Sequence, residues 1–129
     1  MKHTLAARLG AIALVCVAAL GVAAPAIAGS GVDREGNCSN RSEWRLKASE
    51  QDGRIEVEGR VDSDVAGQRW RWKMLHNGEV SARGRATTDG SGGSFRVRRL
   101  MVNISGDDHI GWRATNRGTG EVCRGNLTF

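Results

Sequence analysis

The sequence predicts an all-β domain, a seven-stranded antiparallel β-sandwich formed by residues 42–129. Two observations support this fold class. Apolar residues recur at every second position in short segments, which is the period of a β-strand. Turn residues separate these segments roughly every 8 to 12 positions and no stretch shows helical spacing, a combination typical of sandwiches.

The first two expected strands, residues 43–48 and 54–62, form a hairpin with a turn at Asp52 and Gly53. In both segments charged residues alternate with apolar ones, so one side of the hairpin faces the core. The inward residues are Trp44, Leu46 and Ala48 in the first strand and Ile55, Val57 and Val61 in the second.

The next two expected strands, residues 69–74 and 80–86, form a second hairpin. Asn77 and Gly78 between them tolerate the positive φ values of a type I′ turn. Residues 69–74 show the clearest alternation in the chain. The inward residues are Trp70, Trp72 and Met74, followed by Val80, Ala82, Gly84 and Ala86.

The last three expected strands cover residues 94–104, 110–114 and 123–129. The inward pattern of the first of them slips near Arg98, and we expect a β-bulge there. The inward residues are Phe95, Val97, Leu100, Val102 and Ile104, then Ile110, Trp112 and Ala114, then Cys123, Gly125, Leu127 and Phe129. All four tryptophans therefore belong to the expected core.

Residues 1–28 have the pattern of a cleaved secretory signal. A basic start at residues 2–8 precedes an uncharged apolar run over residues 9–24, and the Ala-Ile-Ala sequence at 26–28 matches a cleavage site. Cleavage leaves a polar leader, residues 29–41, before the domain. We therefore expect a secreted protein, extracellular or in the cell envelope, without stable membrane insertion.

Two other interpretations of this segment compete with the first. An uncleaved membrane anchor would use residues 9–28, which have about the length of a membrane span. A lipoprotein would need Cys16 to be lipidated, but the bulky Val15 precedes it where a small residue is expected.

Cleavage would leave 101 residues with a net charge of +3, from 17 Lys and Arg against 14 Asp and Glu. Two cysteines would remain, Cys38 and Cys123. Because an exported domain of this size has a limited core and meets an oxidising environment, we expect these two residues to form one disulfide.

Residues 108–129, DHIGWRATNRGTGEVCRGNLTF, resemble the last two strands of an immunoglobulin-like or fibronectin type III-like domain. The resemblance implies an immunoglobulin-like sandwich in which Cys38 and Cys123 lie at the same pole. Trp112 and Ile110 stand where immunoglobulin domains have the second core cysteine and the corner tyrosine, so neither feature is expected. The chain also resembles small exported single-domain proteins of high-G+C bacteria, and its 15 Arg against 2 Lys after cleavage agrees with that source.

The sequence lacks the motifs of an enzyme, a metal site or a cofactor site. His76 precedes the Asn77-Gly78 turn and is expected to be an exposed turn residue. Asp107, Asp108 and His109 are adjacent, and three adjacent side chains rarely converge on one metal ion. No nucleophile elbow, zinc-protease motif or phosphate-binding glycine loop is present. We therefore expect no catalysis and no cofactor.

The outward residues of four expected strands are mostly basic. These strands, residues 69–74, 80–86, 110–114 and 123–129, are neighbours in the fold that the chain resembles, so their outward residues would share one face. This basic face consists of Arg69, Arg71, Lys73, Arg83, Arg85, Arg113 and Arg124. The opposing sheet mixes basic residues with Glu and Asp.

The basic face suggests a non-catalytic binding or envelope-structural module with an anionic partner, such as a cell-wall polymer or an acidic protein. In the competing interpretation, the arginines only solubilise the sheet and protect its edges. Nucleic acid is not expected, because no outward aromatic residue could stack on bases. An alternative function is a small carrier that binds an apolar ligand between the sheets near Trp70 and Trp72. The sequence does not indicate an oligomeric state.

Overall fold

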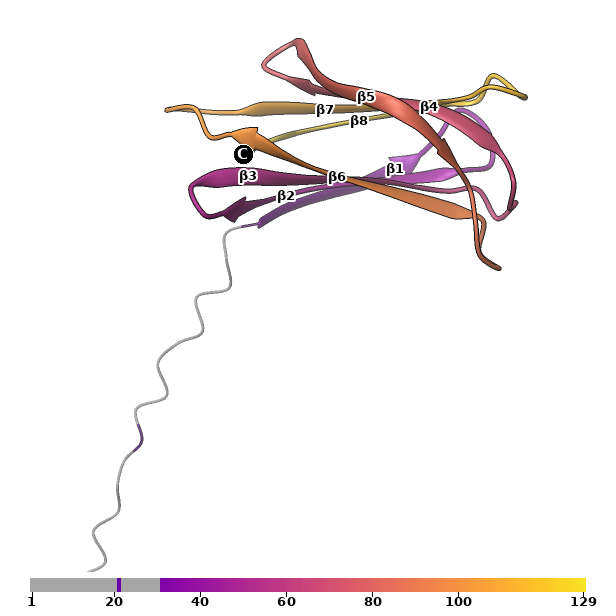
Figure 1. Cartoon of the computed structure of the whole chain (residues 1–129), viewed down its shortest axis with the longest axis horizontal. Coiled ribbons are helices and arrows are strands. Elements are labelled where there is room, and N and C mark those ends of the chain that lie inside the picture. The colour runs from indigo at the N-terminus through magenta and orange to yellow at the C-terminus, as the bar shows by residue number, and fades with distance from the viewer. Residues whose placement is uncertain (1–20, 22–30) are drawn as a thin grey trace, which may run out of the picture.

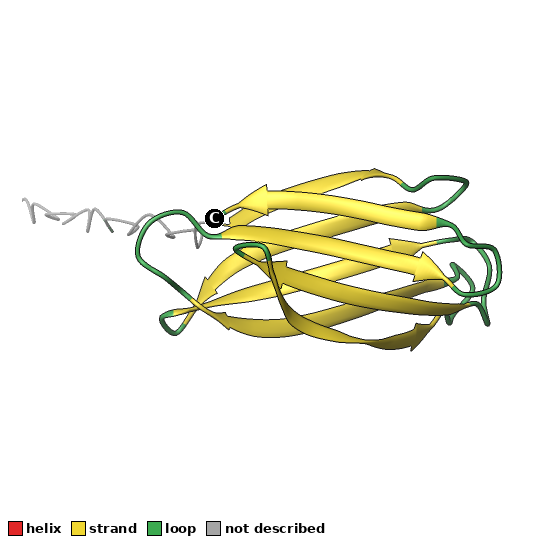
Figure 2. Cartoon of the chain, turned by 90° about the horizontal axis from the view of Figure 1, so that it is seen from above, coloured by secondary structure: helices red, strands yellow, loops and turns green. Residues whose placement is uncertain are grey.

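Two four-stranded antiparallel sheets pack against each other in the computed structural model, which describes Gly21 and residues 31–129 (Figure 1). The strands are β1 (Gly31–Asn37), β2 (Glu43–Gln51), β3 (Arg54–Asp62), β4 (Arg69–His76), β5 (Glu79–Thr87), β6 (Ser94–Val102), β7 (His109–Asn116) and β8 (Val122–Thr128). One sheet has the order β1-β2-β3-β6 and the other β5-β4-β7-β8. Turns and loops join the strands at the two ends of the sandwich (Figure 2).

The expected signal segment, residues 1–28, lies outside the described residues apart from Gly21. In the region that the structure does describe, no helix could cross a membrane. The prediction of an all-β antiparallel sandwich is confirmed.

The number of strands is eight, so the prediction of seven is wrong. The additional strand, β1, lies inside the expected polar leader and pairs with β2 from Gly31↔Ser49 to Asn37↔Glu43. Only Val32 and Gly36 of β1 are partly buried. A polar edge strand of this kind shows no apolar alternation, because backbone pairing and not side-chain burial holds it in the sheet.

β6 runs without the bulge that was expected near Arg98. Its register with β3 is continuous along the whole strand. Phe95, Val97 and Met101 are buried, and the inward position between the last two is taken by Arg99. The Arg99 guanidinium carbon lies 4.9 Å from the centroid of a Trp72 ring, a cation–π contact at the edge of the core.

Three residues that were expected to face inward are exposed: Leu100 and Val102 have the outward parity of β6, and Ile104 lies beyond its end. Leu100, Val102 and Ile104 are 52%, 67% and 49% exposed. The alternation of apolar and polar residues gave the wrong parity because Arg99, a charged residue, occupies an inward position. Its long side chain covers apolar surface while the guanidinium group stays near water.

The irregularity lies instead between β4 and β5. Their register shifts between Met74 and Leu75, after which Leu75 pairs with Val80. Val80 is therefore 43% exposed, and the prediction that it faces inward is wrong. The turn itself is as expected, with φ values of 49° at Asn77 and 86° at Gly78.

Aromatic side chains fill most of the space between the sheets. Trp70, Trp72 and Trp112 are buried, and Trp44 is partly buried against the same core. The rings of Trp72 and Trp112 stack with centroids 6.1 Å apart. Glycines leave room for these rings.

Gly59 on β3 provides the first test of this packing. A Cβ atom at Gly59 would lie 2.4 Å from the Trp112 ring, so Gly59→Ala is expected to lower the free energy of unfolding by about 1 to 3 kcal/mol through overpacking. Urea denaturation measures the loss. Gly92→Ala is the matched control, because nothing lies within 4 Å of a Cβ there. Equal stabilities of the two variants would contradict the packing argument.

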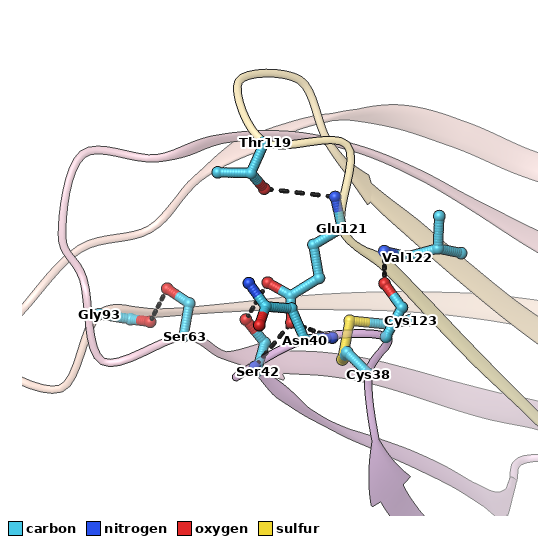
Figure 3. Close-up of a disulfide and its surroundings, with 10 residues drawn as sticks. Cys38, Asn40, Ser42, Ser63, Gly93, Thr119, Glu121, Val122 and Cys123 are labelled. Carbon is cyan, nitrogen blue, oxygen red and sulfur yellow. Dashed lines mark hydrogen bonds between the residues drawn. A yellow bond between two sulfur atoms is a disulfide. The ribbon is translucent and has the colours of Figure 1, made fainter.

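The predicted disulfide between Cys38 and Cys123 is present and joins the β1–β2 loop to the start of β8 (Figure 3). The buried carboxylate of Glu121 reinforces the link by accepting hydrogen bonds from the Ser42 N–H at 2.7 Å, the Ser42 hydroxyl at 2.8 Å and the Asn40 N–H at 3.2 Å. Disulfides of this kind are typical of proteins outside the reducing cytosol.

Candidate functional site

The seven residues of the basic face all lie on the β5-β4-β7-β8 sheet, and each alternates with residues that face the core. β4 provides Arg69, Arg71 and Lys73, β5 provides Arg83 and Arg85, β7 provides Arg113, and β8 provides Arg124. Lys73 and Arg113, on the two central strands, are half-buried, and the other five are exposed. The structure thus brings all seven to the outer face of one sheet.

Strand register aligns four of these residues directly opposite one another. Arg83 pairs with Lys73, Lys73 pairs with Arg113, and Arg113 pairs with Arg124. We call Arg83, Lys73, Arg113 and Arg124 the cationic row. Neighbouring strands are about 4.8 Å apart, so the row crosses all four strands over about 14 Å.

A shorter line of charge runs beside the row. Arg71 pairs with Arg85 on one side and with Thr115 on the other. Arg69 is the outward residue before Arg71 on β4 and lies opposite Thr87. The positive charge is therefore densest along the row and spreads from it toward the start of β4.

The basic face lacks the acidic partners found elsewhere. The five Arg–carboxylate ion pairs among the described residues lie on the other sheet, and none involves the seven basic-face residues. On the other sheet Glu58 alone binds both Arg96 and Arg98, at 3.2 and 2.8 Å. Like charges directly opposite each other destabilise a sheet, so the arrangement of the basic face is unfavourable in the unbound protein.

Sequence reasoning missed an eighth cation, Arg117, in the turn after β7. Its N–H donates a hydrogen bond of 2.8 Å to the carbonyl of Arg69. The pKa of Arg117 is lowered from its usual value chiefly by repulsion from Arg71, then by Arg85, desolvation and Arg69. No sequence pattern could predict that Arg117 lies beside the basic face, because residues in a turn do not alternate between two faces as residues in a strand do.

A hollow of about 630 Å³ opens on this face. Its lining includes five of the seven predicted residues, together with Thr115 and the strand residues between them. These lining residues are Arg71, Trp72, Lys73, Arg83, Gly84, Arg85, Arg113 and Thr115. Arg69 and Arg117 line a neighbouring hollow, and Arg124 lines neither. We call the larger one the central hollow.

The chemistry of the central hollow favours binding of oxyanions. Guanidinium groups offer paired N–H donors that match carboxylate and phosphate oxygens, and Thr115 adds a hydroxyl. A guanidinium group stays protonated near neutral pH, so these arginines supply charge and hydrogen bonds rather than acid–base chemistry.

The two histidines among the described residues have different surroundings. His76 was expected to be exposed, but its side chain is 13% exposed and Nε2 lies 2.5 Å from Oδ1 of the buried Asp108. The exposed His109 instead places Nδ1 3.1 Å from the Thr128 hydroxyl. The turn sequence predicts backbone angles but not the contact with Asp108, which comes from a distant loop.

The adjacent residues Asp107, Asp108 and His109 therefore do not converge. Asp108 points into the protein toward His76, and its Oδ2 accepts a hydrogen bond of 3.3 Å from the Ile104 N–H. Among the described residues, no three His, Cys, Asp or Glu side chains are grouped as metal ligands would be.

The space near Trp70 and Trp72, where a carrier would hold an apolar ligand, is occupied by other side chains. Trp70 is fully buried, with its ring centroid 6.0 Å from that of Phe95, and Trp72 stacks on Trp112. The central hollow that Trp72 helps to line is surrounded by outward cations.

Comparisons with protein-family models, with curated proteins and with solved structures find no match for this chain. The site must therefore be interpreted from its own geometry and charge.

Proposed function

We propose that the protein is an exported, non-catalytic binding or envelope-structural module that holds an anionic polymer on its basic face. The cationic row supports this proposal most directly. Four cations lie directly opposite one another on neighbouring strands, and no ion pair among the described residues neutralises them. A bound polyanion would relieve that repulsion and gain charge-assisted hydrogen bonds.

An exported location is part of the proposal. The Cys38–Cys123 disulfide supports it, because such bonds persist in oxidising compartments. The signal-like pattern of residues 1–28 supports it independently. The anionic partner would then be a polymer of the cell envelope.

We also infer an immunoglobulin-like topology for the sandwich. Without β1, the sheets have the orders β2-β3-β6 and β5-β4-β7-β8. If β2 is strand A and β8 is strand G, these orders correspond to A-B-E and C′-C-F-G, with strand D missing and β1 added at the edge. The supporting feature is this strand order, together with the resemblance of residues 108–129.

Retention on an anionic polymer matrix tests the function. A variant with Arg69→Ser, Arg71→Ser and Arg113→Ser is expected to elute at lower salt than the natural protein, because the basic face loses three positive charges. The slope of log affinity against log salt should fall by about 0.7 for each contact that the variant loses.

The control removes the same charge from the other sheet, with Arg34→Ser, Lys47→Ser and Arg54→Ser. This control is expected to elute close to the natural protein. If both variants elute together, the arginines of the basic face serve solubility alone and the proposed function is wrong.

A further inference from the structure

We propose that the ligand is a linear polyanion bound in an extended form across the strands, along the cationic row. This inference rests on the proposed function and specifies the shape and direction of the ligand. The chemical class is a chain of phosphate or carboxylate groups whose anionic groups are no further apart than about 5 Å, the spacing of the strands.

The row provides an unbroken path across the whole sheet. It begins at Arg83 on β5 and ends at Arg124 on β8, and these are the two edge strands of the sheet. A polymer lying on the row can enter over one edge and leave over the other. A polymer much longer than the width of the sheet can therefore bind through an internal segment, and neither of its ends has to lie on the sheet.

The alternative direction, along β4, is less suitable. Cations on one strand recur at every second residue, about 6.7 Å apart, so their charge density is lower than along the row. After Lys73 the next outward residue of β4 is Leu75, which is half-buried beside Gly111. Val80, opposite Leu75, is an exposed apolar residue. A polyanion running along β4 would meet this uncharged surface.

The central hollow lies between the row and the shorter line of Arg85, Arg71 and Thr115 beside it. Lys73, Arg83 and Arg113 line it, and Thr115 lies one step beyond Arg113 on β7. A narrow chain can enter a hollow of this kind and approach Lys73 and Arg113, the two half-buried cations. The broad surface of a folded acidic protein would reach mainly the exposed arginines around the hollow.

Stacking on nucleic-acid bases has no support. None of the eight residues that line the hollow exposes an aromatic face, because Trp72, the one aromatic residue among them, is 5% exposed.

Two variants with equal charge loss test the direction. The row variant is Arg83→Ser, Arg113→Ser and Arg124→Ser, and the off-row variant is Arg69→Ser, Arg85→Ser and Arg117→Ser. The dissociation constant of each for a long linear polyphosphate is measured at fixed low salt. We expect the row variant to lose affinity on the order of ten-fold more than the off-row variant.

Each outcome of this comparison is decisive. Equal losses, or a larger loss in the off-row variant, would overturn the row while leaving the basic face as a binding surface. No loss in either variant would overturn the proposed function as well. Thermal unfolding of both variants shows whether the fold is kept, which is expected because five of the six substituted residues are exposed.

Ligand length gives a second, independent test on the natural protein. The affinity should rise steeply from pyrophosphate through tripolyphosphate to chains that span about 14 Å, and more slowly for longer chains. Equal affinity for pyrophosphate and long chains would overturn the row, because one small site would then suffice. A polyuronate of matching length forms a parallel arm: weakening of both ligands in the row variant assigns recognition to negative charge along the row, and weakening of polyphosphate alone assigns it to phosphate.

Discussion

Replacing both Cys38 and Cys123 by alanine is expected to lower the free energy of unfolding by about 4 to 5 kcal/mol. The disulfide joins residues 85 positions apart, so its loss lets nearly the whole unfolded domain explore more conformations. Small domains have total stabilities of about 5 to 15 kcal/mol, which makes this loss a large fraction of the total. Urea denaturation of the variant against the oxidised natural protein measures it.

A reducing agent provides the control for this experiment. It should move the unfolding midpoint of the natural protein toward that of the variant and leave the variant itself unchanged. A loss below about 1 kcal/mol would mean that the hydrogen bonds of Glu121 hold this pole without the covalent link.

Asp108→Ala is expected to lower the free energy of unfolding by about 3 kcal/mol, because it removes a buried hydrogen-bonding group and leaves its partners unsatisfied. Asp108 is fully buried, and its carboxylate contacts His76 and the Ile104 N–H. Removing the carboxylate leaves both groups without this partner. Chemical denaturation near neutral pH measures the effect.

His109→Ala is the matched control for Asp108→Ala. His109 is the next residue in the chain, but it is exposed, and its side chain lies within hydrogen-bond distance of the Thr128 hydroxyl. Its replacement is expected to change the stability by about 0.5 kcal/mol or less. Similar losses for both variants would contradict the structural role assigned to Asp108.

Most of the core could be predicted from alternation alone. Trp70, Trp72 and Met74 on β4, and Ile110 and Trp112 on β7, are buried as expected. Alternation succeeds where a strand has one buried and one solvated face, because the period of two then appears directly in the residue types.

The pattern failed where something other than burial determines the position of a residue. β1 is held by backbone pairing at a sheet edge, so its polar sequence shows no alternation. Arg99 fills an inward position through its contact with Trp72 and reverses the expected parity of Leu100 and Val102. The register shift between β4 and β5 turns the Val80 side chain to the outer face, and no feature of the sequence predicts this shift.

The sequence by itself determined that the chain forms an antiparallel sandwich, that Cys38 and Cys123 pair, and which basic residues point away from the core. These properties follow from local periodicity and from the chemistry of cysteine, both of which can be seen in one chain. Only the tertiary structure decided that Arg83, Lys73, Arg113 and Arg124 stand in one row, that Arg117 joins them, and that Asp108 is buried against His76. Register and loop contacts join residues that are far apart in the sequence, so no period along the chain reports them.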